Sequence, residues 1–418
     1  NSVCRFIFAL IFVIGSFSVN PRLSGAQPSS LDSRVFEWRF YVQTNPDLLQ
    51  AGIVTKAQAQ NHWLNAGIYE GRQAHPGFHS RQYLDRYADV RNAYGATNYL
   101  GAIQHYLSYG FNENRHGYIE SGAYGRWTIR TNSANSDSNA IYVSASARMA
   151  GAIDSIVWGG REFINNYDHG RQLQIAFSKH PLGECYNPTQ AGSIHDGFSW
   201  TSTSQLLSVA AWSNILSTWS KPAFWLNPNQ FPQIREKCPY GFNTTIVSNY
   251  GIQTKIRIGD AVANAIRFST SIVVPEPITT SLVIEGPIAY VTRDFATAYE
   301  LIGTSTRILS QMEPSSQEHP NVVILATSDK NHAIGIWSPF LPQSGFGAYA
   351  YAYGNNVGSG ASNDDFAETR WVRATFRSGV LAPNSVVPLC TYVVVGSLTT
   401  VRGTIIQLKS TPVSNLCS

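Results

Sequence analysis

From Ala140 onward, apolar and polar residues alternate along the chain with the period of two that half-buried β-strands require. These segments are rich in β-branched and aromatic residues, and Gly, Pro, Asn or Asp ends most of them. The pattern predicts strands at 140–146, 155–159, 172–177, 205–212, 252–258, 265–274, 280–286, 288–294, 321–328, 333–338, 371–377, 391–397 and 404–410. Within this part, the sequence pattern predicts a helix only at 294–311. We therefore expect residues 140–418 to form a mainly β domain, a large antiparallel β-sandwich.

Residues 36–118 follow a different pattern, in which two successive copies repeat residue types at fixed offsets. The first half of each copy matches at a spacing of 42 residues, and a one-residue insertion shifts the second half. The matched pairs are Phe36 and Phe78, Tyr41 and Tyr83, Asp47 and Asp89, His62 and His105, Trp63 and Tyr106, Leu64 and Leu107, Gly67 and Gly110, Glu70 and Glu113, and Arg72 and Arg115. Each copy predicts a pair of short helices, so together they predict a small α-helical module with a common core.

Within this module, His62 and His105 occupy equivalent positions. A residue repeated in a small helical unit is usually architectural, so we expect each histidine to hydrogen-bond inside its own copy rather than to bind a metal. The spacing F-x-x-x-x-Y, N-P-D, H-W and G-x-x-E-G-R resembles a short repeat of bacterial secreted and surface proteins. That resemblance implies little about activity, because such repeats accompany many unrelated catalytic and adhesive domains. Residues 119–139, rich in Gly, Ser and Asn, are the expected linker.

The N-terminal residues have the layout of a secretory signal peptide. Residues 6–14 are a continuous apolar run after Arg5, too short to span a bilayer, and Ser24-Gly25-Ala26 is a small-x-small cleavage pattern. The alternative is a buried N-terminal strand or helix. We expect residues 1–26 to be removed as a signal peptide, which predicts a secreted, extracellular or periplasmic protein with no membrane insertion.

The cysteine pattern fits an oxidising compartment. Beyond residue 26 the cysteines are Cys185, Cys238, Cys390 and Cys417, and their even number predicts two disulfides. Of the three possible connectivities, proximity in sequence favours Cys185–Cys238 and Cys390–Cys417. Their spacings match no zinc-ligand pattern, so we expect no metal site. The glycosylation sequon Asn243-Thr244-Thr245 is expected on a surface loop.

Composition narrows the functional classes. Charged residues make up 13% of the 418 residues and hydrophobic residues 43%, with 10 Trp, 21 Tyr and 20 Phe. The formal net charge is +4 and no Lys/Arg cluster occurs, so nothing supports nucleic-acid binding through phosphate neutralisation. The chain has no G-x-S-x-G, P-loop or H-E-x-x-H motif, which removes the ordinary hydrolase, nucleotide and zinc-protease classes. We expect no cofactor, and the sequence leaves the oligomeric state open.

The densest group of chemically active side chains lies in residues 158–174, with the sequence WGGREFINNYDHGRQLQ. Such clustering in a low-charge β protein requires that the groups pair, contact water or act on a ligand. The structural alternative is that Asp168, Arg171 and Glu162 form salt bridges that hold a β-hairpin. The stretch also resembles early strands of the galactose-mutarotase-like super-sandwich, which occurs in aldose epimerases, glycoside hydrolases and polysaccharide lyases. The resemblance extends over about 140–418, with its motif in 153–177, and implies a super-sandwich and a carbohydrate partner.

Two kinds of chemistry follow from that resemblance. Epimerase chemistry implies an imidazole that protonates the ring oxygen and a carboxylate that removes the anomeric proton. The candidates are His169 or His332 for the imidazole, and Glu285 or Glu368 for the carboxylate. Lyase chemistry implies a group that neutralises a uronate and a Tyr or His that abstracts a proton. Candidates for catalysis or sugar binding in the stretch are Arg161, Asn166, Tyr167, Asp168, His169 and Arg171.

Aromatic residues supply a further candidate surface. In residues 345–354, Tyr349, Tyr351 and Tyr353 alternate with small residues, so a strand would place all three on one face. If exposed, they would form a stacking platform for sugar rings; if buried, they would belong to the core. Four tryptophans are expected in the core: Trp212, Trp219, Trp225 and Trp337.

Two functional hypotheses remain, and the sequence does not decide whether the protein is an enzyme. The first is a secreted carbohydrate-binding or carbohydrate-processing protein of epimerase, lyase or hydrolase type, with its site around 161–171. The alternative is a non-catalytic extracellular adhesion or matrix scaffold. Catalysis requires His169 and Arg171 to open into a cleft that also contains a carboxylate. The scaffold hypothesis requires the charged groups to pair with each other.

Overall fold

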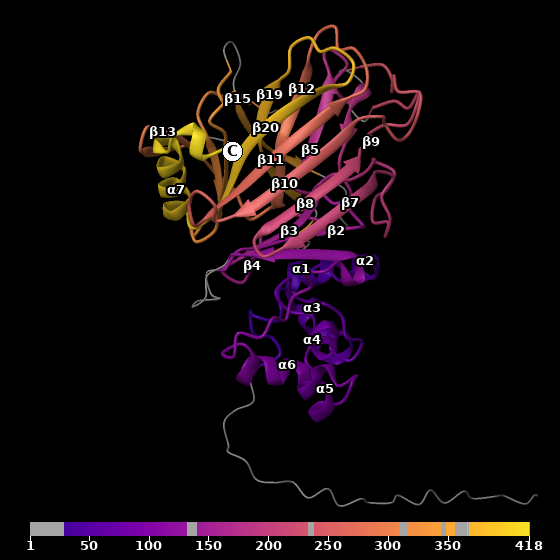
Figure 1. Ribbon diagram of the computed structural model, residues 1–418, viewed down its shortest axis with the longest axis vertical. Coiled ribbons are helices and arrows are strands. Elements are labelled where there is room, and N and C mark those ends of the chain that lie inside the picture. Colours follow the sequence, from indigo (N-terminus) through magenta and orange to yellow (C-terminus); the bar gives the residue numbers. More distant parts are fainter. Residues whose placement is uncertain are drawn as a thin grey trace, which may run out of the picture.

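The computed structural model describes residues 29–131, 140–232, 238–309, 317–343, 348–355, 366 and 368–417. Within them the chain is mainly β, with antiparallel sheets that form a sandwich after a short N-terminal helical region (Figure 1). This confirms the predicted fold class. The expected signal peptide, residues 1–26, lies outside the described residues. Among the described helices, none has the length and apolarity needed to cross a membrane.

The helical region contains two successive groups of short helices. The first group is α1 (Trp38–Gln43), α2 (Pro46–Gln50), α3 (Lys56–His62) and η1 (Trp63–Gly67). The second group is α4 (Ser80–Arg86), α5 (Ala88–Tyr94), α6 (Tyr99–His105) and η2 (Tyr106–Gly110). In each group the third α-helix continues directly into a π-helical turn. The side chains of Thr55 and Asn98 cap α3 and α6 by accepting backbone hydrogen bonds.

The two groups are held by the same internal contacts. The Tyr41 hydroxyl lies 2.7 Å from Nδ1 of His62, and the Tyr83 hydroxyl lies 2.9 Å from Nδ1 of His105. The predicted architectural role of both histidines is therefore confirmed. A Cβ atom on Gly67 would lie 2.0 Å from the Tyr41 hydroxyl oxygen, so the π-helical turn requires a glycine beside the tyrosine.

A matched ion network closes each group. The pairs are Arg72 with Asp47 (2.8 Å) and Glu70 (2.5 Å), and Arg115 with Asp89 (2.7 Å) and Glu113 (2.6 Å). The repeated offsets in the sequence therefore have a physical cause. Each copy contains its own tyrosine–histidine hydrogen bond and its own arginine with two salt bridges.

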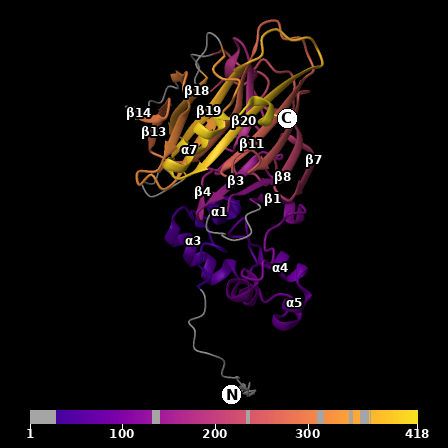
Figure 2. The same ribbon diagram turned by 60° about the vertical axis from the view of Figure 1, so that its left-hand side comes forward.

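Three antiparallel sheets follow. A four-stranded sheet contains, in order, β1 (Arg126–Arg130), β2 (Tyr142–Ser146), β3 (Ile153–Trp158) and β4 (Arg161–Glu162). A nine-stranded sheet contains β14 (Ser305–Ile308), β13 (Thr297–Ile302), β16 (Val323–Ala326), β17 (Ala333–Trp337), β20 (Ser385–Gly396), β11 (Ala265–Val274), β10 (Gly251–Ile258), β8 (Ile215–Lys221) and β7 (Gln205–Trp212). A seven-stranded sheet contains β15 (Gln317–His319), β18 (Tyr349–Asn355), β19 (Glu368–Arg377), β12 (Leu282–Thr292), β5 (Gln174–Lys179), β6 (Pro188–Thr189) and β9 (Ala223–Phe224). Figures 1 and 2 show the four-stranded sheet between the helices and the larger sheets.

The two larger sheets enclose the main core. Strand β10 shows why the sequence alternates, since Ile252 and Ile256 are buried whereas Gln253 and Lys255 are exposed. One face of the nine-stranded sheet therefore packs on the core, and the other is its outer face.

The C-terminal segment covers one end of that outer face. Helix α7 (Leu398–Ser410) packs so closely on β17 that a Cβ atom on Gly335 would lie 2.9 Å from Ile405. After the turn η6 (Val413–Asn415), the disulfide Cys390–Cys417 fixes the segment to β20. The second disulfide, Cys185–Cys238, starts in the turn η5 (Gly183–Tyr186). Both predicted disulfide pairings are confirmed.

Two predictions of element type are wrong. The described residues of 294–311, the segment expected as a helix, contain β13 and β14, because pairing with β16 buries residues of β13. Residues 404–410, expected as a strand, belong to α7, where Val401, Ile405 and Leu408 bury one helical face. A short apolar run fits either period, and the neighbouring elements decide between them.

Two predicted boundaries also differ. The strands expected at 280–286 and 288–294 form the single strand β12, interrupted by an irregularity in register between Glu285 and Ile288. The expected linker 119–139 contains the turn η3 (Ala123–Gly125) and strand β1, which pairs along its length with β2. Residues 132–139 of that linker lie outside the described residues.

Candidate functional site

The charged stretch lies where the helical region contacts the sandwich, a contact that we call the junction. Gln43, at the end of α1, accepts a hydrogen bond from the backbone N–H of Asn166. Arg148 donates to the Gln43 carbonyl oxygen at 3.0 Å. Trp38 of α1 lies against Phe366, with ring centroids 5.7 Å apart. Contacts from both parts of the molecule therefore bury the stretch.

Asp168 and Arg171 form an ion pair in the junction. Nε of Arg171 lies 2.7 Å from Oδ1 of Asp168, and the Arg171 guanidinium carbon lies 5.3 Å from the centroid of the Tyr167 ring. Arg171 also donates to the carbonyl oxygen of Phe366 at 3.1 Å. Burial raises the pKa of Asp168, and the positive charge of Arg171 opposes that rise. This ion pair is one part of the structural alternative, whereas Glu162, its third member, forms no ion pair among the described residues.

His169 is enclosed by backbone. His169 is only 2% exposed. Its Nδ1 lies 2.9 Å from the carbonyl oxygen of Gly197, and its Nε2 lies 2.9 Å from the carbonyl oxygen of Arg148. Burial lowers the pKa of His169, and the hydrogen bonds to the carbonyl groups partly offset that effect. Both nitrogens are thus occupied by protein atoms.

Glu162, Arg161 and Asn166 also bind protein groups. Glu162 accepts hydrogen bonds from Ser155 Oγ (2.5 Å) and from the backbone N–H groups of Ile156 and Ile164 (2.9 Å each), while burial raises the pKa of Glu162 to about 8. Arg161 pairs with Asp294, and Oδ1 of Asn166 accepts a bond of 2.6 Å from Gln172.

The remaining acid–base candidates are scattered. Glu285 on β12 pairs with Arg373 on β19. His332 lies beside Trp158, with ring centroids 5.9 Å apart. The side chain of Glu368 lies outside the described residues. Within the described part of the chain, no hydrogen bond or ion pair joins Glu285 to His169 or His332.

Electrostatics nevertheless connects several of these candidates to Tyr290 on β12, which sequence reasoning missed. Burial raises the pKa of Tyr290; the charge of Glu285 raises it further, and those of Arg373 and Arg171 lower it. Asp168 acts in the same direction as Glu285. We call these five residues the Tyr290 cluster. In the sequence, Tyr290 sits in an ordinary strand pattern (IAYVT), which gave no signal of charged neighbours.

Two of the three candidate platform tyrosines are in the core. Tyr349 is 1% exposed, with its hydroxyl 3.3 Å from the backbone nitrogen of Ser338, and Tyr351 is 8% exposed and stacks on His319. The side chain of Tyr353 lies outside the described residues. Tyr349 and Tyr351 therefore belong to the core and form no exposed platform for sugar rings.

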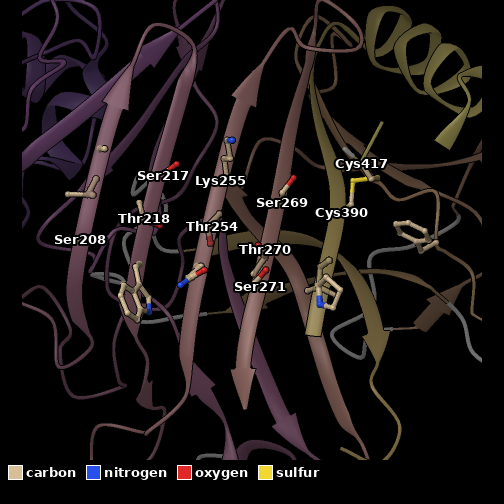
Figure 3. Close-up of a pocket in the computed structure, with 17 residues that line it drawn as sticks. Ser208, Ser217, Thr218, Thr254, Lys255, Ser269, Thr270, Ser271, Cys390 and Cys417 are labelled. Atoms are coloured by element: carbon tan, nitrogen blue, oxygen red, sulfur yellow. A yellow bond between two sulfur atoms is a disulfide. The ribbon is translucent and has the colours of Figure 1, made fainter. Parts of the chain in front are cut away.

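The outer face of the nine-stranded sheet carries a trough with a volume of about 910 Å³ (Figure 3). Cross-strand pairing aligns its side chains in two rows across β7, β8, β10, β11 and β20. One row is Ala210, Ser217, Lys255, Ser269 and Cys390. The other is Ser208, Trp219, Gln253, Ser271 and Pro388. Directly opposed residues point to the same side of a sheet, so both rows face outward together.

The trough combines hydroxyl and amide groups with exposed rings. Trp219 is 43% exposed and Phe340 is 52% exposed. The disulfide Cys390–Cys417 lies along β20 at the trough, as Figure 3 shows. Of the described residues that line the trough, only Lys255 is charged.

Two of the four tryptophans expected in the core are exposed. Trp212 is 46% exposed, like Trp219 at 43%, whereas Trp337 is 6% exposed and Trp225 is partly buried. The prediction is wrong for Trp212 and Trp219, because apolar character alone does not tell which face of a strand meets the second layer.

The glycosylation sequon is not on an open surface. Asn243 is 5% exposed, and its Nδ2 donates to the carbonyl oxygens of Leu226 (3.0 Å) and Thr245 (2.9 Å). The acceptor nitrogen is therefore engaged inside the fold, which contradicts the expected surface position.

Comparison with known proteins finds similarity to solved structures at low identity. No protein-family model matches the chain, and no curated protein matches it. Similar solved structures include a heparan sulfate lyase mutant from Pedobacter heparinus, at 10% identity and a TM-score of 0.37 over 83% of this chain and 48% of that chain. They also include the galactose mutarotase related enzyme from Lactobacillus acidophilus, at 12% identity and a TM-score of 0.34 over 66% of this chain and 98% of that chain. The chain thus spans about half the length of the lyase.

Proposed function

We propose that the protein is an extracellular carbohydrate-binding protein whose binding site is the trough. The observation that carries this proposal is the alignment of Trp219 and Gln253 in one cross-strand row with hydroxyl-bearing neighbours. Sugars present hydroxyl groups on their edges and C–H groups on their faces. An exposed indole beside hydroxyl and amide groups matches both kinds of surface.

The dimensions favour a chain of sugars over a single sugar. Neighbouring strands lie about 4.8 Å apart, so the four intervals from β7 to β20 span roughly 19 Å. The rows run across the strands, and an oligosaccharide would lie along them. Because Lys255 is the one charged residue among the described lining residues, the trough suits a neutral or weakly acidic glycan.

Two disulfides support an extracellular or periplasmic place of action, since such bonds persist in oxidising compartments. One of them also braces the site. Cys390–Cys417 holds the C-terminal segment at the trough, which keeps the lining in place without a bound ligand.

Glycan-array binding by the wild-type chain and by Trp219→Ala and Gln253→Ala tests this proposal. We expect Trp219→Ala to weaken binding about tenfold, as loss of one aromatic contact of about 1.4 kcal/mol implies. Trp212→Ala is the matched control, because Trp212 is equally exposed on neighbouring β7 but does not line the trough. Equal binding by all four proteins, or no glycan bound by folded wild-type protein, would contradict the proposal.

A second candidate function, carbohydrate processing, is favoured by the Tyr290 cluster. A phenol whose pKa responds to the charges of two guanidinium and two carboxylate groups has the residue types for proton transfer beside an anionic group. The test is product formation from any glycan that the array identifies. Tyr290→Phe should abolish turnover and keep glycan binding, while Tyr109→Phe in the helical region should keep both. Absence of product with wild-type protein would exclude processing of those glycans.

A further inference from the structure

A separate pocket with a volume of about 390 Å³ lies at the junction. Its walls come from both parts of the molecule, because residues 44–45, 70–73, 79 and 81 lie in the helical region and residues 124–126, 146–148 and 200 follow it. We propose that this junction pocket binds a small anion that carries a carboxylate, sulfate or phosphate group.

The charge of the lining points to an anion. Four arginines line the pocket, Arg72, Arg81, Arg126 and Arg148, together with one carboxylate, Glu70. Arg72 is compensated by Asp47 and Glu70. Arg126 is compensated by Asp154, which accepts two bonds of 2.8 and 2.9 Å from its guanidinium group.

Arg81 and Arg148 have no such compensation. Arg81 donates to the carbonyl oxygens of Gly71 and Glu70. Arg148 donates to the carbonyl oxygens of Ser199 and Gln43, each at 3.0 Å. Among the described residues, neither arginine forms an ion pair with a carboxylate. Carbonyl oxygens satisfy hydrogen bonds but do not neutralise a positive charge, so two guanidinium charges remain.

Burial makes the charge of Arg148 more costly. Arg148 is 8% exposed, and its Nη2 is buried with no hydrogen-bond partner in the described part of the chain. Burial lowers the pKa of Arg148 to about 10, an effect that Asp154 and Asp168 offset only in part. A bound anion would compensate the part of this charge that the protein carboxylates leave.

The rest of the lining suits a small organic anion as well as an inorganic one. The side chains of Thr44, Asn45 and Ser146 offer neutral hydrogen-bonding groups. Trp200 is 56% exposed and Tyr124 is 57% exposed, so both rings are accessible beside the charged groups. Such rings favour a ligand with an apolar or sugar-like body and one anionic group.

Isothermal titration of the full chain with citrate, sulfate and phosphate, each added separately at low salt, tests the proposal. We expect one-site binding of at least one probe, no heat with uncharged glucose, and weaker binding at high salt. Arg81→Gln should weaken the binding about tenfold, the loss expected for one charge-assisted contact. Arg81 is exposed, so this variant should fold even where Arg148→Gln does not.

The repeat supplies the control variant. Arg115→Gln removes an arginine with the same kind of ion pairs as Arg72, at a position that does not line the pocket, and should leave anion binding unchanged. Binding of no probe by folded wild-type protein would overturn the proposal, as would equal weakening by Arg115→Gln and Arg81→Gln. Trp219→Ala should bind the anion like wild type, which separates this pocket from the trough.

Discussion

Arg148 and Gln43 are 105 residues apart in the sequence, yet the guanidinium group of Arg148 donates to the Gln43 carbonyl oxygen at 3.0 Å. The same guanidinium donates to the Ser199 carbonyl oxygen, also at 3.0 Å. One side chain therefore connects α1 to two parts of the β region. The charged stretch 161–171 lies around this connection, so its polar groups hold the junction together.

Arg148→Ala should lower the free energy of unfolding by about 1–3 kcal/mol, because it leaves the buried Gln43 carbonyl oxygen without this donor and also removes the partly buried bond to Ser199. Chemical denaturation measures the change. Arg115→Ala, which breaks an exposed ion network instead, should cost less than about 1 kcal/mol. Similar losses in both variants would show that Arg148 does not hold the junction.

Gly67→Ala should destabilise the helical region, because the added Cβ would lie 2.0 Å from the Tyr41 hydroxyl oxygen. We expect a loss of about 1–3 kcal/mol, the usual cost of an added group in a closed site, measured by thermal or chemical denaturation. Gly403→Ala is the matched control in α7. Nothing lies within 4 Å of a Cβ at Gly403, so alanine should stabilise that helix by about 0.5–1 kcal/mol.

The combined contribution of His75, His79 and Glu162 to stability should be greatest near pH 6.5. Burial lowers the pKa of His75 and of His79 from 6.5 to about 3, and each Nδ1 accepts a backbone hydrogen bond that requires a neutral ring. Below pH 6.5 the unfolded chain binds these two protons more readily, so stability falls with falling pH. Burial raises the pKa of Glu162 from 4.5 to about 8, so above pH 4.5 the folded state holds a proton that the unfolded chain releases.

The two effects combine in a definite way. Between pH 4.5 and 6.5, unfolding takes up two histidine protons and releases one carboxyl proton, so the contribution of these groups to stability rises with pH. Between pH 6.5 and 8, unfolding only releases the Glu162 proton, so that contribution falls with pH. These three groups together should therefore contribute a fall of about 1.4 kcal/mol per pH unit on either side of pH 6.5. Urea denaturation across this range measures it. His79→Asn keeps a side chain that caps α4 without titrating, so it should flatten the acid side, and an unchanged profile would contradict the assignment.

Removal of Cys390–Cys417 should affect both stability and the trough. Its sequence separation of 27 residues predicts a loss of about 3.5 kcal/mol for the Cys390→Ser/Cys417→Ser double variant. Glycan binding should weaken as well, because both cysteines line the trough. Cys185→Ser/Cys238→Ser, with a separation of 53 residues, should cost about 4 kcal/mol and keep glycan binding in protein that remains folded. Equal glycan binding by both double variants would contradict this view of the trough.

Asn243 should remain unmodified when the protein is produced in a host that glycosylates sequons, provided that the chain folds before modification. Its Nδ2 is buried and bonded to two carbonyl oxygens. Peptide mass spectrometry measures the occupancy. Thr245→Ala should leave the glycan content unchanged, whereas a glycan on Asn243 in folded protein would show that this loop opens.

The features that could be predicted from the sequence depend on contacts between residues close together in the chain. The alternation in β10 follows from the single buried face of an antiparallel sheet, and the repeated Tyr–His and arginine networks follow from contacts within one copy. Disulfide pairing followed proximity in sequence. Each of these features depends on residues whose spacing along the chain already limits what they contact.

The sequence by itself thus determined the β class, the two helical copies and the two disulfides. Only the tertiary structure decided that residues 404–410 are helical, that Trp219 faces outward and that the stretch 161–171 is buried in the junction. The same holds for the two rows of the trough, whose members come from five strands. The physical reason is that burial and charge compensation depend on the second surface that reaches a residue. Distant parts of the chain supply that surface, and the local pattern does not encode it.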